Sequence, residues 1–305
     1  ITPLRDIGLI IEYIRIFKII NPDLIFSYTI KPNIYGAIAS KITNHRQIVT
    51  ITGTGRIFLY DNLVNILAKV LYKLSIRGSY KVFFQNNSNK DFFVKHKLVK
   101  DNFSVLPGSG VNLEEYTYSV MPSDDVTNFI YIGRIEEFKG FDLYLETAKI
   151  IMNDNPKTNF YVAGYIFDKK YQQIIEEYHS NRIIKFLGFQ KDIKPWIEKC
   201  HCTILPALGG EGISNTLLET AAMGRVCIAS DIPGCRDVIE DGVTGYLFEC
   251  GNTKDLITKM EKFLALEYQA KVQMGWAGRK KVELEFNRQF VVDAYMKEVD
   301  KLNSQ

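Results

Sequence analysis

The sequence predicts an α/β protein made of two parallel-sheet domains. Short apolar runs rich in β-branched residues alternate with amphipathic segments of helical length, and the alternation stops once and then restarts. Strands that alternate with such helices form parallel sheets with helices on both faces. With 305 residues, of which 46% are hydrophobic and 24% charged, the chain is long enough for two such domains.

The first expected domain covers residues 1–118. We expect strands at 24–28, 47–51, 81–85 and 102–106, and helices at 6–19, 33–43, 62–77 and 88–96. Four strands are few for a Rossmann-like sheet, so we expect this front domain to be truncated and to lack one or two βα units at its amino end. Residues 108–126 lose the periodicity and carry Gly, Ser, Pro and acidic residues, which predicts a linker.

The second expected domain covers residues 119–286. We expect strands at 128–133, 159–164, 182–188, 202–207, 225–230 and 244–248, and helices at 140–153, 168–178, 191–199, 213–223, 252–266 and 268–284. The last segment, 287–305, is expected to form a helix that packs back towards the front domain. Ligands of such sheets bind outside the carboxyl ends of the strands, so two Rossmann-like domains facing across a cleft would bring two sets of these ends together.

The charge is unevenly distributed along the chain. Residues 1–118 hold 15 lysines and arginines against 8 aspartates and glutamates, a net charge of +7, whereas the whole chain is at +3. A basic front half fits an anionic membrane surface, a phosphate-bearing ligand or merely solvated lysines. Nucleic acid is the least favoured partner, because the basic residues are scattered. The apolar segment 7–20 is interrupted by charges at helical spacing, which indicates an amphipathic helix that packs on the core or lies on a membrane.

The cysteines argue against a disulfide scaffold and for a reducing cytoplasm. Their number is odd and they are confined to one part of the chain. They are Cys200, Cys202, Cys227, Cys235 and Cys250. The Cys200-His201-Cys202 triplet could suggest zinc, but no second ligand pair lies at a suitable spacing. We therefore interpret these residues as part of a buried strand.

A glycine-rich loop followed by a helix carries the first candidate site. In GGEGISNTLLETAAM (209–223), Ser214 and Asn215 can cap a helix that starts at the carboxyl edge of the sheet, where its N–H groups would bind an anion. Glu211 and Glu219 are eight residues apart, or roughly 12 Å along a helix. That length suits a sugar at one end of a diphosphate and a ribose at the other. The alternative is a loop charge and an exposed helical glutamate without function.

A second segment, IGRIEEFKGFDLYLETA (132–148), places two cations after a strand and before a helix. Arg134 and Lys139 could neutralise a leaving diphosphate there, although a solvated loop would show the same residues.

Both segments, together with GFQKDI (188–193) and IPGCRDVIEDGVTGYLF (232–248), resemble the retaining glycosyltransferases of family four, which have the two-domain B-type fold. The E-x7-E signature is specific here because G-R-x4-K precedes it and PG-x-R-[DE]-V follows it. Segments 29–41, 50–58 and 105–116 are similar to the bacterial subgroup that builds surface polysaccharides and lipid-linked oligosaccharides.

The resemblance implies transfer of a sugar, with retention of configuration, from a nucleotide-sugar such as a UDP-sugar to a polyprenyl-diphosphate-linked or polysaccharide acceptor. Glu211 would contact the donor sugar, Glu219 the ribose, and Arg134 and Lys139 the diphosphate. Further donor-binding residues would be Gly133, Gly188, Phe189, Gly210, Gly212, Ile213, Ser214, Asn215 and Thr216. The sequence has no D-x-D motif, so neither a metal nor another cofactor is expected. The enzyme would lie in the cytoplasm, at the inner face of the plasma membrane.

The front domain departs from the family pattern. Tyr28 or Thr52 stands where many members carry a histidine, and the first strand and glycine-rich loop usual in the family do not precede residue 1. Tyr28, Thr52 and Gly53 are still expected to line the cleft. Two alternatives remain open at this point: a sugar-nucleotide epimerase of the same fold, and a truncated chain that binds nucleotide without turnover.

Overall fold

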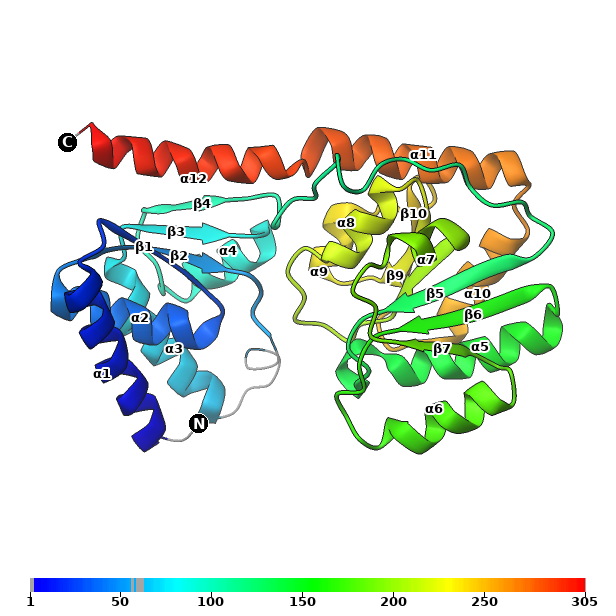
Figure 1. Ribbon diagram of the computed structural model, residues 1–305, viewed down its shortest axis with the longest axis horizontal. Coiled ribbons are helices and arrows are strands. Elements are labelled where there is room, and N and C mark those ends of the chain that lie inside the picture. Colours follow the sequence, from blue (N-terminus) through cyan, green and yellow to red (C-terminus); the bar gives the residue numbers. More distant parts are fainter. Residues whose placement is uncertain (1–2, 56–57, 59–62, 305) are drawn as a thin grey trace. The chain divides into compact units, whose positions relative to one another are not determined.

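The computed structural model describes residues 3–55, 58 and 63–304. It divides the chain into two compact units (Figure 1): unit 1 comprises residues 1–109 and 289–305, and unit 2 comprises residues 110–288. The sequence suggested divisions after residues 118 and 286. The first division comes earlier because Val111 pairs with Asn287 as an isolated bridge and is buried in the core of unit 2.

Unit 1 contains a four-stranded parallel sheet in the order β1-β2-β3-β4. Its strands are β1 (Leu24–Tyr28), β2 (Arg46–Ile51), β3 (Lys81–Phe84) and β4 (Phe103–Val105). Its helices are α1 (Pro3–Ile20), α2 (Ile30–Thr43), α3 (Leu63–Ser75), α4 (Asn87–Lys95) and α12 (Arg288–Asn303), with a 3-10 turn η2 (Ile76–Gly78). Every expected element of the front block is present, with ends that differ by at most three residues.

Both faces of this sheet are covered, because alternate residues of each strand point to opposite sides. Val49 and Phe84 face a core that includes residues of α2, α3 and α4. Ile48 and Phe83 face the other way and pack with α12, whose Tyr295 ring lies 4.9 Å from that of Phe83. The last helix of the chain therefore completes the core of unit 1.

Unit 2 contains a six-stranded parallel sheet in the order β10-β9-β8-β5-β6-β7. The strands are β5 (Thr127–Ile132), β6 (Thr158–Ala163), β7 (Lys185–Gly188), β8 (Cys202–Leu205), β9 (Val226–Ser230) and β10 (Gly245–Phe248). The helices are α5 (Phe141–Asp154), α6 (Tyr171–Ser180), α7 (Lys194–Lys199), α8 (Asn215–Ala222), α9 (Pro233–Val238), α10 (Thr253–Leu264) and α11 (Tyr268–Glu285), with a 3-10 turn η3 (Glu137–Lys139). Only α9 and the 3-10 turns were not expected from the sequence.

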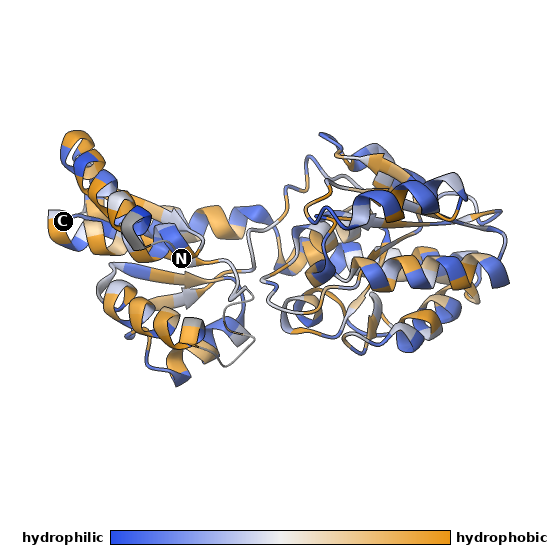
Figure 2. Cartoon of the chain, turned by 90° about the horizontal axis from the view of Figure 1, so that it is seen from below, coloured by the Kyte–Doolittle hydropathy of each residue, from blue (hydrophilic) through white to orange (hydrophobic). Residues whose placement is uncertain are grey.

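Helices lie on both faces of the unit 2 sheet (Figure 1). On one face, α5, α6 and α10 enclose an aromatic core in which the Phe129 and Phe160 rings stack at 5.2 Å. On the other face, α8, α9 and α11 pack over smaller residues such as Cys227 and Ala229. Figure 2 shows hydrophobic residues along the strands and hydrophobic and hydrophilic residues alternating along the helices.

The segment predicted as a linker is largely part of unit 2. Met121 is 3% exposed and belongs to the aromatic core. The buried Arg225 guanidinium donates hydrogen bonds to the carbonyl oxygens of Ser119 (2.7 Å) and Val120 (3.0 Å). These hydrogen bonds satisfy backbone carbonyls of a segment that has no regular secondary structure. Because such contacts leave no periodic pattern in the sequence, the composition alone suggested a linker.

The strand order places a topological switch point between β5 and β8. The chain continues from β5 to β6 and β7 on one side, then returns to the other side of β5 as β8, β9 and β10. The loops that follow β5 and β8 therefore diverge at the carboxyl edge, which is where sheets of this class bind ligands. Arg134 and Lys139 follow β5, and Glu211 follows β8.

Candidate active site

Close backbone contacts join the two loops at the switch point. Gly140 has a φ of +67°, and a Cβ at this position would lie 1.8 Å from the carbonyl oxygen of Pro206. The Leu208 N–H donates to the Phe138 carbonyl at 3.0 Å. Because only glycine allows this approach, the turn that ends at Lys139 is held directly against the loop after β8.

Lys139 and Glu211 form an ion pair across these loops. The Lys139 Nζ contacts the Glu211 Oε1, and the two side chains are only 19% and 15% exposed. A pair so far removed from water depends on each partner to compensate the other's charge. The sequence predicted both residues as catalytic but did not predict that they contact each other.

Arg134 is the more accessible cation. Its side chain is 44% exposed, contacts the buried Glu136 carboxylate at 3.1 Å and lies over the Phe167 ring, 5.4 Å from the ring centre. The Tyr131 hydroxyl donates to the Arg134 carbonyl at 2.7 Å. Burial raises the pKa of Tyr131 well above its usual range, and the charges of Glu136 and Glu211 raise it further. Tyr131 therefore stays protonated, within electrostatic range of both carboxylates.

The glycine-rich loop turns sharply before α8. Gly210 has a φ of +67°, in the left-handed region, and a Cβ on Gly234 of α9 would lie 1.5 Å from the Gly212 carbonyl oxygen. Ser214 occupies the N-cap position of α8, but its side chain makes no capping hydrogen bond. The predicted capping position of Ser214 is therefore correct, but the hydrogen bond expected from its side chain is not formed. The first N–H groups of a helix are the ones that bind an anion when no side chain satisfies them.

Glu219 lies in a separate cluster. Burial raises the pKa of Glu219 to about 7, and a hydrogen bond from the Tyr116 hydroxyl opposes part of that rise. The Lys194 ammonium lies 5.5 Å from the Tyr116 ring centre and pairs with Glu115 at 3.2 Å. The negative charge of Glu115 also raises the pKa of Glu219. Glu219 is therefore a carboxyl group that can change its charge near neutral pH.

A pocket of about 240 Å³ opens at the carboxyl ends of β5, β6 and β7. It is lined by Ile132, Gly133, Arg134, Ala163, Gly164, Tyr165, Phe189, Gln190 and Ile193. It thus joins three residues predicted to bind the donor: Gly133, Arg134 and Phe189. Gly188, with a φ of +68°, makes the turn that leaves the Phe189 side chain 71% exposed. Apolar side chains dominate this lining, which suits a flat ring better than a phosphate.

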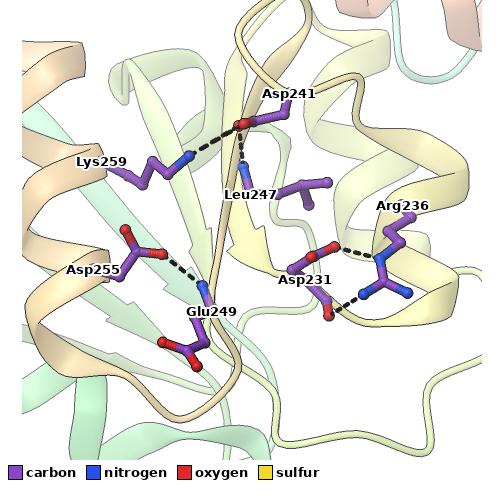
Figure 3. A network of polar contacts seen from close by, with 7 residues as sticks. All are labelled: Asp231, Arg236, Asp241, Leu247, Glu249, Asp255 and Lys259. Atoms are coloured by element: carbon purple, nitrogen blue, oxygen red, sulfur yellow. Dashed lines mark hydrogen bonds and ion pairs between the residues drawn. The ribbon is translucent and has the colours of Figure 1, made fainter.

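A network of polar contacts fixes α9 and β10, next to the glycine-rich loop (Figure 3). The Arg236 guanidinium binds the Asp231 carboxylate and carbonyl. Asp241 accepts a hydrogen bond from the Leu247 N–H at 2.8 Å and pairs with Lys259 at 3.2 Å. Gly234 of α9 contacts the loop that carries Glu211. By fixing α9, the network therefore also helps to position that loop.

The other predicted residues fall into two groups. In unit 2, Ile213 and Ser214 are buried, Thr216 is half-buried and Asn215 is exposed. In unit 1, the three residues expected to line a cleft all lie at the carboxyl edge of the sheet: Tyr28 ends β1, and Thr52 and Gly53 follow β2. Arg56 and Ile57, from segment 50–58, lie outside the described residues. A role for this edge in a cleft stays a prediction.

Two residues of the site were not predicted. Tyr116 lies in the aperiodic segment, where no pattern indicates which side chain turns inward. Glu136 lies between the two predicted cations in the sequence, and an acid at that place in a basic motif could have indicated a partner for Arg134.

The Cys200-His201-Cys202 triplet is structural. The His201 Nδ1 accepts a hydrogen bond from the Asn128 N–H at 3.1 Å, and burial lowers the pKa of its imidazole. Cys200 and Cys202 are free and buried, and Cys202 begins β8. Within residues 3–55, 58 and 63–304, no group of His, Cys, Asp and Glu side chains is arranged to hold a metal ion. All three residues are buried, as expected, but only Cys202 belongs to the strand, because Cys200 caps α7 and His201 lies between the two elements.

Known proteins match this chain in both units. Residues 126–265 match the family model described as glycosyl transferases group 1, and residues 2–86 match the model described as glycosyl transferase 4-like. The chain is a family-four glycosyltransferase. Both matches are to glycosyltransferases, which favours transfer over the epimerase alternative.

The relatives and structural neighbours of this glycosyltransferase agree over nearly its whole length. It is 25% identical over 306 residues to the N,N'-diacetylbacillosaminyl-diphospho-undecaprenol α-1,3-N-acetylgalactosaminyltransferase of Campylobacter jejuni, covering 94% of this chain and 79% of that one. It is 24% identical to the UDP-Gal:α-D-GlcNAc-diphosphoundecaprenol α-1,3-galactosyltransferase of Escherichia coli, over 85% and 71% of the two chains. The structure of Anabaena HepE in complex with UDP-glucose superposes with a TM-score of 0.81 at 18% identity, over 97% and 82%. The glycosyltransferase B-type fold predicted from the sequence is thereby confirmed.

Proposed function

We propose that this glycosyltransferase moves a sugar, with retention of configuration and without a metal ion, from a UDP-sugar to a sugar linked to polyprenyl diphosphate. The product would be an intermediate of a cell-surface glycan. The two curated relatives support the acceptor class, because their names describe transfer to diphospho-undecaprenol-linked sugars. The name of the Escherichia coli enzyme and the UDP-glucose complex of HepE support a UDP-sugar as donor.

The observation that carries the proposal is the Lys139–Glu211 pair at the switch point. A diphosphate at the start of α8 would meet the helix N–H groups and the Lys139 ammonium together. Glu211, held by Lys139, would accept hydrogen bonds from the hydroxyls of the donor sugar. This pairing argues against Glu211 as a nucleophile, since its charge is already engaged.

The pocket beside Arg134 has the size and lining expected for the uracil base. In this arrangement Arg134 lies between the base pocket and the diphosphate, and Glu219 is left to bind the ribose hydroxyls. In the transition state the bond from the sugar C1 to the diphosphate breaks and negative charge collects on the diphosphate. The acceptor hydroxyl oxygen bonds to C1 and would pass its proton to the departing diphosphate oxygen. Lys139, Arg134 and the start of α8 would stabilise that charge. They would supply what a bridging metal supplies in other enzymes.

A donor screen followed by a turnover assay tests the proposal. We expect UDP and UDP-sugars to raise the melting temperature of the chain more than GDP-, ADP- or CMP-sugars do. The best UDP-sugar, incubated with a short-chain polyprenyl-diphosphate-linked sugar, should give a disaccharide product whose anomeric configuration NMR shows to be retained. EDTA should leave the rate unchanged.

Four results would contradict parts of this scheme. An inverted product would remove the retaining mechanism, and loss of turnover in EDTA would remove metal independence. Conversion of the nucleotide-sugar to an isomer without an acceptor would indicate an epimerase. UDP binding without turnover of any tested donor would favour a chain that only binds nucleotide.

A further inference from the structure

Helix α3 of unit 1 has its hydrophobic residues on the outside. The large aliphatic side chains on one face are exposed, and they recur at helical spacing. They are Leu63 (83% exposed), Ile66 (59%), Leu67 (45%), Val70 (47%) and Leu74 (68%). A helix of a globular protein normally turns such a stripe towards the core and its polar residues towards water. A contiguous exposed apolar face of this kind marks an interaction surface.

The buried face of α3 shows that the helix is not simply misplaced. Tyr72 is 1% exposed, and its ring packs edge-on against Phe93 at 5.1 Å. Ala68 (6%) and Ser75 (0%) are buried beside it, and the Ser75 hydroxyl donates to the Leu71 carbonyl at 2.6 Å. The helix is thus anchored by small and aromatic residues, while five larger aliphatic ones remain outside.

Positive charge surrounds the carboxyl end of this face. Residues 63–90 contain five lysines and arginines and no aspartate or glutamate. Lys73 and Arg77 are exposed, and the Lys41 ammonium of α2 donates to the Leu74 carbonyl at 2.6 Å. Burial lowers the pKa of Lys41, and the nearby charge of Lys100 lowers it further. Four cations therefore gather around Leu74, and Ile42 next to Lys41 is 60% exposed.

We infer that α3 is a membrane-docking helix, whose aliphatic face inserts into the interfacial region of the nearest leaflet of an anionic bilayer. The cations around it, Lys41, Lys73, Arg77 and Lys100, bind the lipid phosphates. An aliphatic stripe with a cluster of cations at its carboxyl end matches an anionic lipid surface in both polarity and charge. A protein partner would present a folded surface with its own polar groups, and the α3 face offers five aliphatic side chains and no polar one to meet them. No helix of the described residues is long and apolar enough to cross a bilayer, so the contact would be confined to one leaflet. The inference concerns unit 1 and does not depend on the sugar that unit 2 transfers.

Vesicle co-sedimentation tests the charge requirement. We expect the full chain to bind vesicles of phosphatidylcholine with one third phosphatidylglycerol and to bind pure phosphatidylcholine weakly. The double variant Lys73→Glu/Arg77→Glu should lower the partition coefficient roughly 25-fold or more, since each surface charge near such a membrane changes binding about fivefold. The matched control, Lys169→Glu/Lys254→Glu, reverses two exposed lysines of unit 2 and should bind as the unaltered chain does.

Two further variants test the apolar face itself. Leu67→Gln/Val70→Gln should lower binding roughly tenfold or more because two aliphatic side chains no longer leave water. Leu284→Gln, at a side chain of α11 that is 74% exposed, should change nothing. In Leu67→Trp, brominated lipids should quench the added fluorescence, whereas in Leu284→Trp they should not.

Each alternative outcome overturns the inference. If the unaltered chain ignores anionic vesicles, or if the α3 variants bind as it does, α3 is not the docking element. If ultracentrifugation shows a dimer that Leu67→Gln/Val70→Gln dissociates, the face joins two copies of the chain. UDP binding, measured in parallel, should be equal in all these variants. A loss there would indicate misfolding, in which case the single variants Leu67→Trp and Lys73→Glu decide the question.

Discussion

The carboxyl edges of the two sheets differ in charge. In unit 2, the loops after β5 and β8 hold Arg134, Glu136, Lys139 and Glu211. These charges are paired, and all except the exposed Arg134 are partly or fully buried. In unit 1, the described residues that directly follow the four strands are neutral: Thr29, Thr52 to Gly55, Gln85 and Asn86, and Leu106 to Gly108. Two sheets of the same construction therefore present different chemistry at equivalent edges.

This difference in charge suggests that the two units bind different parts of the substrates. A group with two negative charges, such as a diphosphate, is recognised by fixed cations and helix N–H groups, and unit 2 has both. Unit 1 instead carries a cluster of four cations on the surface around α3: Lys41, Lys73, Arg77 and Lys100. Unit 1 thus offers neutral hydroxyl groups at its sheet edge, which suits hydrogen bonding to a sugar, and cations where a membrane could be bound.

Removing both cations of unit 2 should have the largest effect. In Arg134→Ala/Lys139→Ala, we expect turnover to fall by about 1,000-fold or more, because charge develops on the diphosphate in the transition state and one such contact alone is worth about 100- to 1,000-fold. Donor affinity should fall much less. The measurement is kcat and KM with the donor found by screening, and Lys254→Ala, an exposed lysine of α10, is the control. Unchanged turnover in the double variant would mean that unit 2 does not stabilise the leaving group.

The contact between the two loops can be broken at Gly140. Gly140→Ala should lower the free energy of unfolding by about 2–4 kcal/mol, since the new Cβ meets the Pro206 carbonyl and the φ of +67° disfavours any side chain. Gly242→Ala is the matched control, because Gly242 also has a positive φ (+77°) but has nothing within 4 Å of a Cβ. It should cost about 1 kcal/mol. Chemical denaturation measures both, and equal costs would show that the loop contact contributes nothing.

The sequence predicted elements better than contacts. Alternating apolar runs and helical segments located every strand and all long helices, since hydrophobic periodicity directly reflects which side of an element is buried. The approach of Gly140 to Pro206 could not be predicted, because it joins residues 66 positions apart through the strand order. The hydrogen bond between Tyr116 and Glu219 could not be predicted for the same reason. The short helix α9 was missed because six residues are too few to show a period. Of the site, Lys139 and Glu211 were both expected, but their pairing was visible only in three dimensions.

The titration of Glu219 should appear in donor binding. Because its pKa is raised to about 7, the carboxylate that would bind the ribose forms only as the pH rises through neutrality. In Glu219→Gln, UDP should bind more weakly at pH 8 by about 1–3 kcal/mol, and the difference should shrink towards pH 6. Calorimetric Kd values for both proteins check this, and their ratio cancels the titration of UDP itself. A ratio independent of pH would place Glu219 outside the donor site.

The same group has a matching effect on stability. A carboxyl group whose pKa is higher in the folded than in the unfolded chain binds its proton more tightly in the folded state. Its contribution is therefore most favourable below about pH 4.5 and is lost as the pH rises to about 7. Glu219→Gln should remove this slope from the unfolding free energy. A slope that persists in the variant would belong to other groups, such as Asp237, whose pKa burial also raises.

Tyr116→Phe should have the smallest effect, and it tests how the cluster around Glu219 works. The Tyr116 hydroxyl donates to the Glu219 carboxylate and so lowers the pKa of Glu219. Without it, the midpoint of the pH-dependent UDP binding should move up by about 0.5 to 1 pH unit, since a hydrogen bond contributes about 1 kcal/mol. At pH 8.5 and above, the variant should bind UDP nearly as well as the unaltered chain. The control Tyr118→Phe alters a nearby tyrosine whose ring instead packs against Trp276 at 5.1 Å. A uniform loss of affinity at every pH would mean that Tyr116 contacts the nucleotide itself, whereas a shifted midpoint means that it acts through Glu219.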